Sequence, residues 1–427
     1  MMCMVRYLVM TPGPARVFLI SHNFPPTSGP ESSLVRLNTA WMLKAGFDVR
    51  VLTTTRSHTL QAMDRTLMAG LPEDLVVERQ ASPEAVLSEV YPRAGRHIAV
   101  LLGRHVLPEI FLPWALPATE AGCRMVRQWQ PHVIYSRAPK HVSNVVGWRM
   151  KHQTGLPWVA HFSDPWITAG LPYRRLQRLL GLPLERRILR DADALVFVTR
   201  QAMERMLAPH PAAWRERARI IPHGYEAASA DAGAPPAEGP LTVIHAGAFY
   251  PGIRGPETLI EALKRMHAAA SLDGRLVVEC VGDDSVRYRE QADAAGLAGV
   301  LRFVPPVPFD ECQRKIAASH LTLILDTAGY GGVFLPTKLF EAFASRRPVL
   351  GLAEPGSAVA EILEQASLPW ADVRTPAHIA EVFTRLLEAW ETRGEAPTAG
   401  NRDVVERFEI NRVNEPLAAL LHEMAGH

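Results

Sequence analysis

The chain has 427 residues, of which 48% are hydrophobic and 21% are charged, and its formal net charge is +2. This length is too great for one ordinary core and fits two domains, at roughly 150 residues per domain, and the balanced composition excludes a disordered chain. A nearly neutral chain also gives no electrostatic reason to expect a nucleic-acid partner.

The cysteines and the apolar runs indicate the compartment. The four cysteines lie far apart and form no CxxC pair, so they indicate neither a zinc site nor a disulfide framework. The apolar run near the start is short and is broken by Arg6 and by the sequence TPGP, which does not fit a signal peptide. A later run at residues 98–103 is too short to span a bilayer. We therefore expect a cytoplasmic protein without a transmembrane anchor, which could also work at the inner face of the membrane.

The first half of the chain alternates strands and helices. A short apolar strand at residues 16–21 is followed by the loop HNFPPTSGPESS, and apolar side chains then recur at helical spacing as far as Gly46. Further buried strands are predicted at residues 47–54, 132–136, 157–163 and 194–199. Residues 1–225 are therefore predicted to form one Rossmann-like domain.

A second domain follows a break in the pattern. Residues 226–240 are rich in alanine, proline and glycine and have no apolar period, so they are interpreted as a linker. Strands are predicted at residues 241–247, 275–282, 301–305, 321–326 and 348–353. Residues 241–404 would form this domain, and a C-terminal helix at about residues 405–427 could pack back on the first one. The fold class is α/β, with two doubly wound sheets facing across a cleft and ligands at the carboxyl ends of their strands.

Four motifs, taken together, carry a resemblance to a known family. They are HNFPPTSGPESS at residues 22–33, PWVAHFSDPW at 157–166, IPHGYE at 221–226 and GVFLPTKLFEAFASRRPVL at 332–350. In this order and spacing the chain resembles glycosyltransferase family 4, retaining enzymes of the GT-B architecture. The resemblance implies transfer of a sugar, with retention, from a nucleotide-diphosphate sugar to a hydroxyl of a glycan or lipid-linked acceptor, in cell-surface polysaccharide or glycoconjugate synthesis.

The last motif supplies the predicted donor site. Thr337 is a good N-cap for the helix that follows, and the free N–H groups of the first turn, with the charge of Lys338, suit a diphosphate. The resemblance gives Glu341 the role of accepting hydrogen bonds from ribose hydroxyls. Gly332, in the glycine-rich stretch before the helix, would let the backbone approach the ligand closely. The alternative is a capped surface helix with a solvated glutamate.

Two further positions are assigned to the donor phosphates. Gly247 ends a predicted strand, and Arg254 falls where the family has lysine and could bind phosphate oxygens in a bidentate way. With Lys338 and the end of the helix, Arg254 would stabilise the charge that develops on the leaving diphosphate.

The chain departs from the family pattern at three places. Gly29 is kept from a glycine pair that meets the donor phosphates or the acceptor, but the second glycine is Pro30, which has no N–H. Val333 stands in place of a second glutamate, and Ala248 in place of an arginine. These departures keep open a non-catalytic subunit with a degenerate donor site. A nucleotide-sugar epimerase of the same architecture is a further alternative.

The motif HFSDPW is assigned to the acceptor side. Asp164 is expected to meet the acceptor hydroxyl or the donor sugar, and Trp166 to offer an apolar face to a sugar ring or a lipid. His161 lies on the same side, where a structural role is favoured. Asp164 could instead only cap the next segment.

Two charged segments remain. Asp191 and Asp193 have the spacing of a metal-binding DxD motif, but they stand between a helix and a strand and are read as structural, so neither a metal nor another cofactor is expected. Residues 173–190 carry six arginines and the single acidic residue Glu185, interleaved with leucines. This segment could lie on anionic lipid, or it could be a solvated helical face whose leucines pack on the domain.

Overall fold

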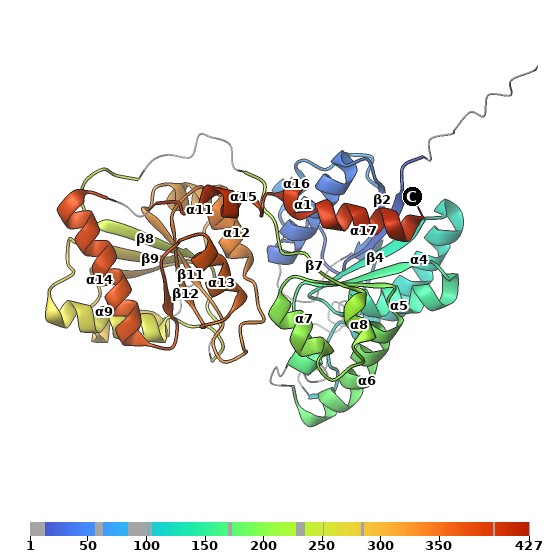
Figure 1. Ribbon diagram of the computed structural model, residues 1–427, viewed down its shortest axis with the longest axis horizontal. Helices are drawn as coiled ribbons and strands as arrows, with labels where there is room; N and C mark the ends of the chain where they lie inside the picture. The colour runs from blue at the N-terminus through green and yellow to red at the C-terminus, as the bar shows by residue number, and fades with distance from the viewer. Residues whose placement is uncertain are drawn as a thin grey trace, which may run out of the picture.

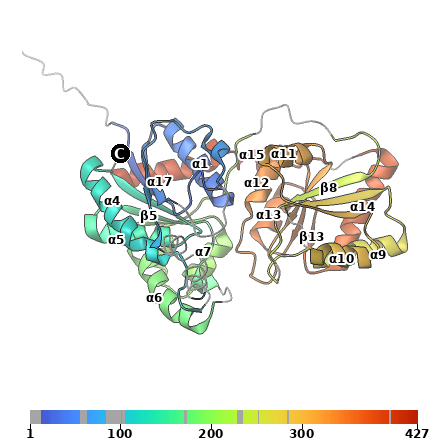
Figure 2. The same cartoon turned by 180° about the vertical axis from the view of Figure 1, so that it is seen from behind.

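The computed structural model describes residues 13–55, 63–83, 101, 105–169, 173–227, 235–250, 252–282, 286–395 and 398–426. They form two α/β domains that lie side by side (Figure 1). The same two bodies are seen from behind in Figure 2.

The N-terminal sheet has seven strands in the order β3-β2-β1-β4-β5-β6-β7, and all its pairings are parallel. The strands are β1 (Arg16–Ile20), β2 (Asp48–Thr54), β3 (Val77–Gln80), β4 (Val133–Ala138), β5 (Trp158–Phe162), β6 (Ala194–Phe197) and β7 (Ala218–Ile220). Residues of β1 alternate between two cores: Phe18 and Ile20 belong to one apolar cluster, and Val17 and Leu19 to the other. This period of two is what a sheet covered on both faces requires.

Helices cover both faces of that sheet. They are α1 (Pro30–Lys44), η1 (Arg65–Met68), η2 (Leu112–Trp114), α4 (Ala115–Trp129), α5 (Val142–Thr154), η3 (Ile167–Ala169), α6 (Arg175–Asp191), α7 (Arg200–Leu207) and α8 (Ala213–Glu216). Helix α1 begins with Pro30 at its first position, where a missing N–H costs nothing. Its side chains pack on one face of the sheet and those of α4 and α5 on the other.

The C-terminal sheet has six parallel strands in the order β10-β9-β8-β11-β12-β13. They are β8 (Leu241–Ala246), β9 (Leu276–Val281), β10 (Leu301–Val304), β11 (Leu321–Leu325), β12 (Val349–Ala353) and β13 (Trp370–Asp372). The helices are α9 (Glu257–Ala269), α10 (Val286–Ala294), α11 (Phe309–Ala317), α12 (Thr337–Ala344), α13 (Ala358–Gln365) and α14 (Pro376–Arg393). Side chains of α9 and α14 pack on one face, and those of α12 and α13 on the other.

The chain passes between the domains twice, and the two crossings pair with each other. The N–H of Tyr225 donates to the carbonyl of Phe408 at 3.0 Å, and the N–H of Ile410 donates to the carbonyl of Tyr225 at 2.8 Å. The second crossing contains α15 (Arg402–Glu406) and α16 (Ile410–Val413) and leads to α17 (Glu415–Ala425). Both views place α17 on the N-terminal domain (Figures 1 and 2), where its leucines join the core. Of the predicted linker, residues 228–234 lie outside the described residues.

Loops at the carboxyl ends of the two sheets touch. The Thr199 hydroxyl, just after β6, donates to the carbonyl of Val333 at 3.1 Å, and the Gln201 amide donates to the carbonyl of Gly356 at 3.0 Å. These acceptors lie in loops that follow β11 and β12. The ligand-binding edges of the two sheets therefore face each other. Among the helices of the described residues, none is long and apolar enough to cross a membrane.

Candidate functional site

The site lies where the strand order reverses in each sheet. The reversal falls between β1 and β4 in the N-terminal sheet and between β8 and β11 in the C-terminal sheet. Loops that leave neighbouring strands in opposite directions open a crevice there, and ligands of doubly wound sheets bind in it. Gly29 lies after β1, Gly247 and Arg254 after β8, and Lys338 after β11. Both sheets thus bring predicted site residues to the expected edge.

Helix α12 begins one residue earlier than the predicted cap requires. Its N-cap is Pro336, with no side-chain hydrogen bond, and Thr337 is the first helical residue. The prediction that Thr337 caps the helix is therefore wrong. The extended backbone of Pro336 (φ −66°, ψ 132°) already makes the turn into the helix, which leaves the Thr337 hydroxyl past the capping position. First-turn N–H groups are left without a side-chain acceptor, as an anion site requires.

Lys338 and Glu341 contact each other. The Lys338 Nζ lies 2.7 Å from the Glu341 Oε2, and each side chain is about one-third exposed, at 33% and 30%. A partly exposed pair one turn apart on a helix stabilises a protein by less than about 1 kcal/mol. A bound anion that attracts Lys338 can therefore open the pair at small cost and leave the Glu341 carboxylate to a hydroxyl group.

The end of β8 lies beneath this pair. A Cβ built on Gly247 would stand 3.7 Å from the Lys338 Cε, so the bare backbone of Gly247 adjoins the lysine side chain. A Cβ on Gly282, at the end of the neighbouring β9, would stand 3.3 Å from the carbonyl carbon of Gly247. The structure thus brings Gly247 and Lys338 together.

Arg254 is the second cation on the donor side. Its guanidinium carbon lies 4.9 Å from the centre of the Tyr250 ring, and its Nη2 donates to the carbonyl of Ala248 at 3.4 Å. Burial lowers the pKa of Arg254, against the attraction of Asp326. Among the described residues, no carboxylate accepts a hydrogen bond from this guanidinium, and its buried Nε has no partner. Arg254 is therefore a half-buried cation that an anionic ligand can satisfy.

Asp326 is a site candidate that the sequence did not single out. It follows β11 directly and is only 2% exposed, and burial raises its pKa to about 6. Its carboxylate accepts from the N–H of Thr327 at 2.7 Å. Its place at the end of an apolar strand, beside the strand that precedes Arg254, is the signal that could have found it.

The glycine-rich stretch before α12 packs closely against another segment of the chain. Gly332 has φ 63°, and a Cβ there would stand 2.3 Å from the Cα of Ser357, the N-cap of α13. The close backbone approach that we predicted at Gly332 is thus to Ser357. The side chain of Val333 is 1% exposed and its carbonyl accepts from Thr199, so this position is used in the contact between the domains.

The N-terminal side holds carboxylates and cations together. Gly29 is the N-cap of α1 with φ 124°, a conformation that favours glycine, and Glu31 stands in the first turn. Burial raises the pKa of Glu31 to about 7, although Lys140 and Arg137 attract its charged form. Burial likewise raises the pKa of Asp164 to about 6, again against Lys140. The ends of β1, β4 and β5 therefore carry a group of two carboxylates and two cations.

Arg137 and Lys140 are further residues that sequence reasoning missed. Arg137 is only 2% exposed, and its Nη2 lies 3.3 Å from the Nδ1 of His223. The Lys140 ammonium lies 4.9 Å from the centre of the Phe111 ring. Their signal is the sequence SRAPKH, which puts two cations three residues apart at the end of a buried strand beside the reversal point.

His161 and Trp166 lie inside the domain. The Nδ1 of His161 is 2.7 Å from the Tyr135 hydroxyl, and burial holds the pKa of this histidine well below its usual range. Trp166 is 0% exposed and stacks on His141 with ring centres 4.7 Å apart. The prediction that Trp166 offers an open face to a sugar or lipid is wrong, because the chain turns inward after Asp164 and His141 covers the ring.

Asp191 and Asp193 have protein partners. Asp191 accepts from the Trp148 ring N–H at 2.9 Å, and Asp193 accepts from the N–H of Trp158 at 2.7 Å. Asp193 also pairs with Lys151. Within the described ranges, no group of three His, Cys, Asp or Glu side chains is arranged to hold a metal ion.

Comparison with known proteins agrees with this geometry. A family model described as glycosyl transferase 4-like domain matches residues 29–224, which include most of the N-terminal domain. The resemblance to family 4 glycosyltransferases is confirmed. Over 140 residues the chain is 25% identical to the probable glycosyltransferase WbjE of Pseudomonas aeruginosa, an alignment that covers 32% of this chain and 33% of that protein.

Solved structures confirm the GT-B architecture. The structure of Anabaena Alr3699/HepE in complex with UDP superposes with a TM-score of 0.64 and 16% identity, covering 96% of this chain and all (100%) of the other. Sucrose-phosphate synthase from Thermosynechococcus elongatus superposes with a TM-score of 0.66 and 17% identity, covering 96% and 99%. At these identities the likeness shows the fold alone.

Proposed function

We propose that the protein is a retaining glycosyltransferase that moves a sugar from a nucleoside-diphosphate sugar to an acceptor hydroxyl without a metal ion. The observation that carries the proposal is the group of Gly247, Arg254 and Lys338 at the reversal point of the C-terminal sheet. A bare strand end, a helix N-terminus and two cations are what a diphosphate needs. The UDP bound by HepE, a protein of the same fold, supports a nucleoside diphosphate as the ligand.

The donor residues would act mainly through charge. As the bond between the sugar and the diphosphate breaks, negative charge grows on the leaving oxygens, and Arg254 and Lys338 would stabilise it. When the phosphate draws Lys338 away, the ion pair with Glu341 opens, and the Glu341 carboxylate becomes available to the ribose hydroxyls. The acceptor hydroxyl would attack from the same face, and a diphosphate oxygen would take its proton, which gives retention.

The acceptor would bind on the opposite domain, at the group formed by Glu31, Lys140 and Asp164. Asp164 would orient the acceptor hydroxyl by accepting its hydrogen bond, which requires the charged carboxylate. Glu31 and Lys140 would set the charge around it, since both contribute to the field at that position.

Helix α6 supports a lipid-linked acceptor, because its exposed side carries several leucines. The buried residues of α6 are Gln177, Gly181, Glu185, Ile188 and Leu189. The Gln177 amide donates to the carbonyl of Leu107 at 2.9 Å, and Glu185 accepts from Thr168. A Cβ on Gly181 would stand 2.7 Å from the Ile167 side chain, so α6 packs tightly on the domain at this glycine.

The outward face of α6 carries arginines and four of the helix's leucines. The exposed leucines are Leu176 (42%), Leu179 (68%), Leu180 (46%) and Leu182 (37%). Leu184 and Leu189 do pack on the core of the domain, as the alternative expected, whereas these four leucines do not. Leucines beside several exposed arginines suit an anionic membrane surface, where the side chains enter the headgroup region and the guanidinium groups meet phosphates. We propose that α6 places the site beside a lipid-linked acceptor.

A panel of nucleotide sugars tests the proposed function. The purified protein would be mixed with each sugar nucleotide, and thermal stabilisation and release of nucleoside diphosphate would be followed, since a ligand that binds the folded state raises the unfolding temperature. We expect one donor to stabilise the protein and to be turned over. Stabilisation without turnover, with acceptor present, would favour the non-catalytic subunit suggested by Pro30, Ala248 and Val333.

A further inference from the structure

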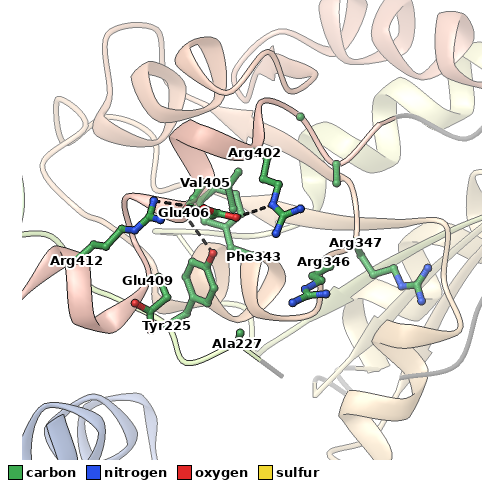
Figure 3. Close-up of a pocket in the computed structure, with 12 residues that line it drawn as sticks. Tyr225, Ala227, Phe343, Arg346, Arg347, Arg402, Val405, Glu406, Glu409 and Arg412 are labelled. Atoms are coloured by element: carbon green, nitrogen blue, oxygen red, sulfur yellow. Dashed lines mark hydrogen bonds and ion pairs between the residues drawn. The ribbon is translucent and has the colours of Figure 1, made fainter. Parts of the chain in front are cut away.

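We propose that the protein has a second anion site, which binds a small phosphorylated metabolite such as a sugar phosphate, at the hinge between its domains. A pocket of about 350 Å³ lies there, and it includes Tyr225, Phe343, Arg346, Arg347, Arg402 and Arg412 in its lining (Figure 3). This proposal does not depend on the glycosyltransferase activity.

The pocket lies at the far end of the donor helix. Helix α12 begins at Thr337, beside the donor site, and ends at Ala344, two residues before Arg346. The other walls come from Tyr225 on the first crossing and from α15 and α16 on the second. The pocket is therefore separate from the donor site and touches both segments that connect the domains.

Arginines dominate the charge of the pocket. It contains Arg346, Arg347, Arg402 and Arg412 and two carboxylates, Glu406 and Glu409. The Glu409 carboxylate is already used, because it caps α16 by accepting from the N–H and the side-chain amide of Asn411, each at 3.0 Å. Glu406 lies between Arg402 and Arg412, with 3.3 Å to the Arg412 Nη1. The pocket thus contains four arginines and one carboxylate that is free of a capping role.

Arg346 is the residue that points most clearly to a ligand. Its guanidinium has no hydrogen bond or ion pair with any residue in the described part of the chain, although its field reaches Glu406 and Tyr225. Its backbone has φ 57°, a left-handed conformation that costs a residue with a side chain roughly 1 kcal/mol. This conformation ends α12, since Arg346 directly follows the C-cap residue Ser345. In Figure 3 the arginine side chain lies among the lining residues, on the same side of the Tyr225 ring as Arg402.

The lining defines the class of ligand. Guanidinium groups bind phosphate oxygens in a bidentate way and do so better than lysine ammonium groups. Tyr225 and Phe343, only 8% and 3% exposed, form an apolar floor with ring centres 6.3 Å apart. A phosphate on a compact sugar fits both features. A ligand held by Arg346 of the donor domain and by Arg402 and Arg412 of the crossing segments would tie the hinge to that domain and restrain domain movement.

Binding of glucose 6-phosphate to the full chain, with glucose as the uncharged control, tests the proposal by calorimetry and thermal shift. Three variants would be compared with the parent: Arg346→Gln, Lys338→Gln at the donor end of the same helix, and Arg385→Gln, which removes an exposed charge elsewhere on the same domain. Each variant's own unliganded unfolding temperature is the reference. Arg412→Gln serves as a second pocket variant should Arg346→Gln fail to fold.

We expect glucose 6-phosphate, but not glucose, to bind and to raise the unfolding temperature of the parent, Lys338→Gln and Arg385→Gln proteins. Arg346→Gln should weaken binding about tenfold, since it loses a charge-assisted contact. Three results would overturn the proposal. The first is that glucose 6-phosphate does not bind the parent, and the second is that it binds Arg346→Gln and Arg412→Gln as tightly as the parent. The third is loss of binding in Lys338→Gln, which would place the sugar phosphate at the donor site.

Discussion

The ammonium group of Lys338 lies 2.7 Å from the carboxylate of Glu341, one turn further along α12. The two residues that we assign to the phosphate and to the ribose of a donor are thus partners of each other when no ligand is bound. Their separation on binding would deliver a cation and an acceptor to the donor at the same time.

The first prediction concerns that pair. Glu341→Gln should weaken binding of a nucleoside diphosphate by about 1.5 to 3 kcal/mol, because a charge-assisted hydrogen bond to the ribose is lost. Inorganic pyrophosphate, which has no ribose, should bind the variant at least as well as the parent, because Lys338 is no longer neutralised. Calorimetry with both ligands measures this. An equal loss of affinity for both ligands would show that Glu341 does not bind the ribose.

The second prediction concerns metal. The phosphate charge is assigned to Arg254, Lys338 and backbone N–H groups, and Asp191 and Asp193 are engaged with protein donors. Transfer should therefore survive excess EDTA, measured after dialysis with the best donor of the panel. Loss of transfer that magnesium or manganese restores would show that a metal takes part.

The third prediction concerns pH and activity. Burial raises the pKa of Asp164 to about 6, so this carboxylate is protonated and neutral below that pH. If the charged form accepts the hydrogen bond of the acceptor hydroxyl, the transfer rate should rise with pH through about 6. The pH profile of Asp164→Asn should lack that rise at its lower rate. A parent profile that is flat from pH 5 to pH 7, on the order of one unit either side of 6, would separate Asp164 from the reaction.

The fourth prediction concerns pH and stability. The pKa of Glu31 is raised to about 7, above its ordinary value of 4.5, so the folded chain holds this proton more tightly than the unfolded chain. The stabilisation from the neutral form is fully present below about pH 4.5 and is lost as the pH rises through about 7. Glu31→Gln should therefore raise the free energy of unfolding more at pH 8 than at pH 4. Denaturant unfolding of both proteins at the two pH values checks this, and an equal effect at both would contradict it.

The fifth prediction concerns α6. Leu179→Asp puts a charge on the most exposed leucine of the helix and should reduce binding to vesicles that contain phosphatidylglycerol. The control is Val286→Asp, on the other domain, whose valine is 62% exposed. Co-sedimentation with the vesicles should separate the two variants, and salt should weaken binding of the parent. Equal binding of both variants to the vesicles would leave α6 without a membrane role.

Much of the fold could be predicted because its signal is local. Buried parallel strands give apolar runs, and the helices between them carry apolar residues at helical spacing, as residues 16–21 and the helix that ends near Gly46 show. α6 was less predictable. Its leucines lie at helical spacing, yet the structure buries Gln177 and Glu185 and leaves four of the leucines exposed, and a pattern alone does not say which face is buried.

Site residues that lie within one sequence motif could be predicted, whereas contacts between segments that are distant in the sequence could not. Lys338 and Glu341 lie in one motif, but their ion pair and the contact of Lys338 with Gly247 depend on tertiary structure. Glu31 begins α1 and Lys140 follows β4, and the two residues meet only because β1 and β4 are neighbours. The error at Trp166 has the same origin, because the residue that covers its ring is His141, 25 positions earlier in the chain.

The most direct test of the proposed function measures nucleoside diphosphate affinity and transfer rate for Arg254→Ala and Asp164→Asn side by side. Arg254→Ala removes a cation that faces the departing diphosphate, so it should weaken diphosphate binding and lower the transfer rate. The two losses together should correspond to a free energy on the order of a few kcal/mol. Asp164→Asn touches no phosphate, so this variant should bind the nucleoside diphosphate about as well as the parent while transfer falls. Full transfer by Asp164→Asn, or parental diphosphate affinity in Arg254→Ala, would contradict the roles assigned to the two domains.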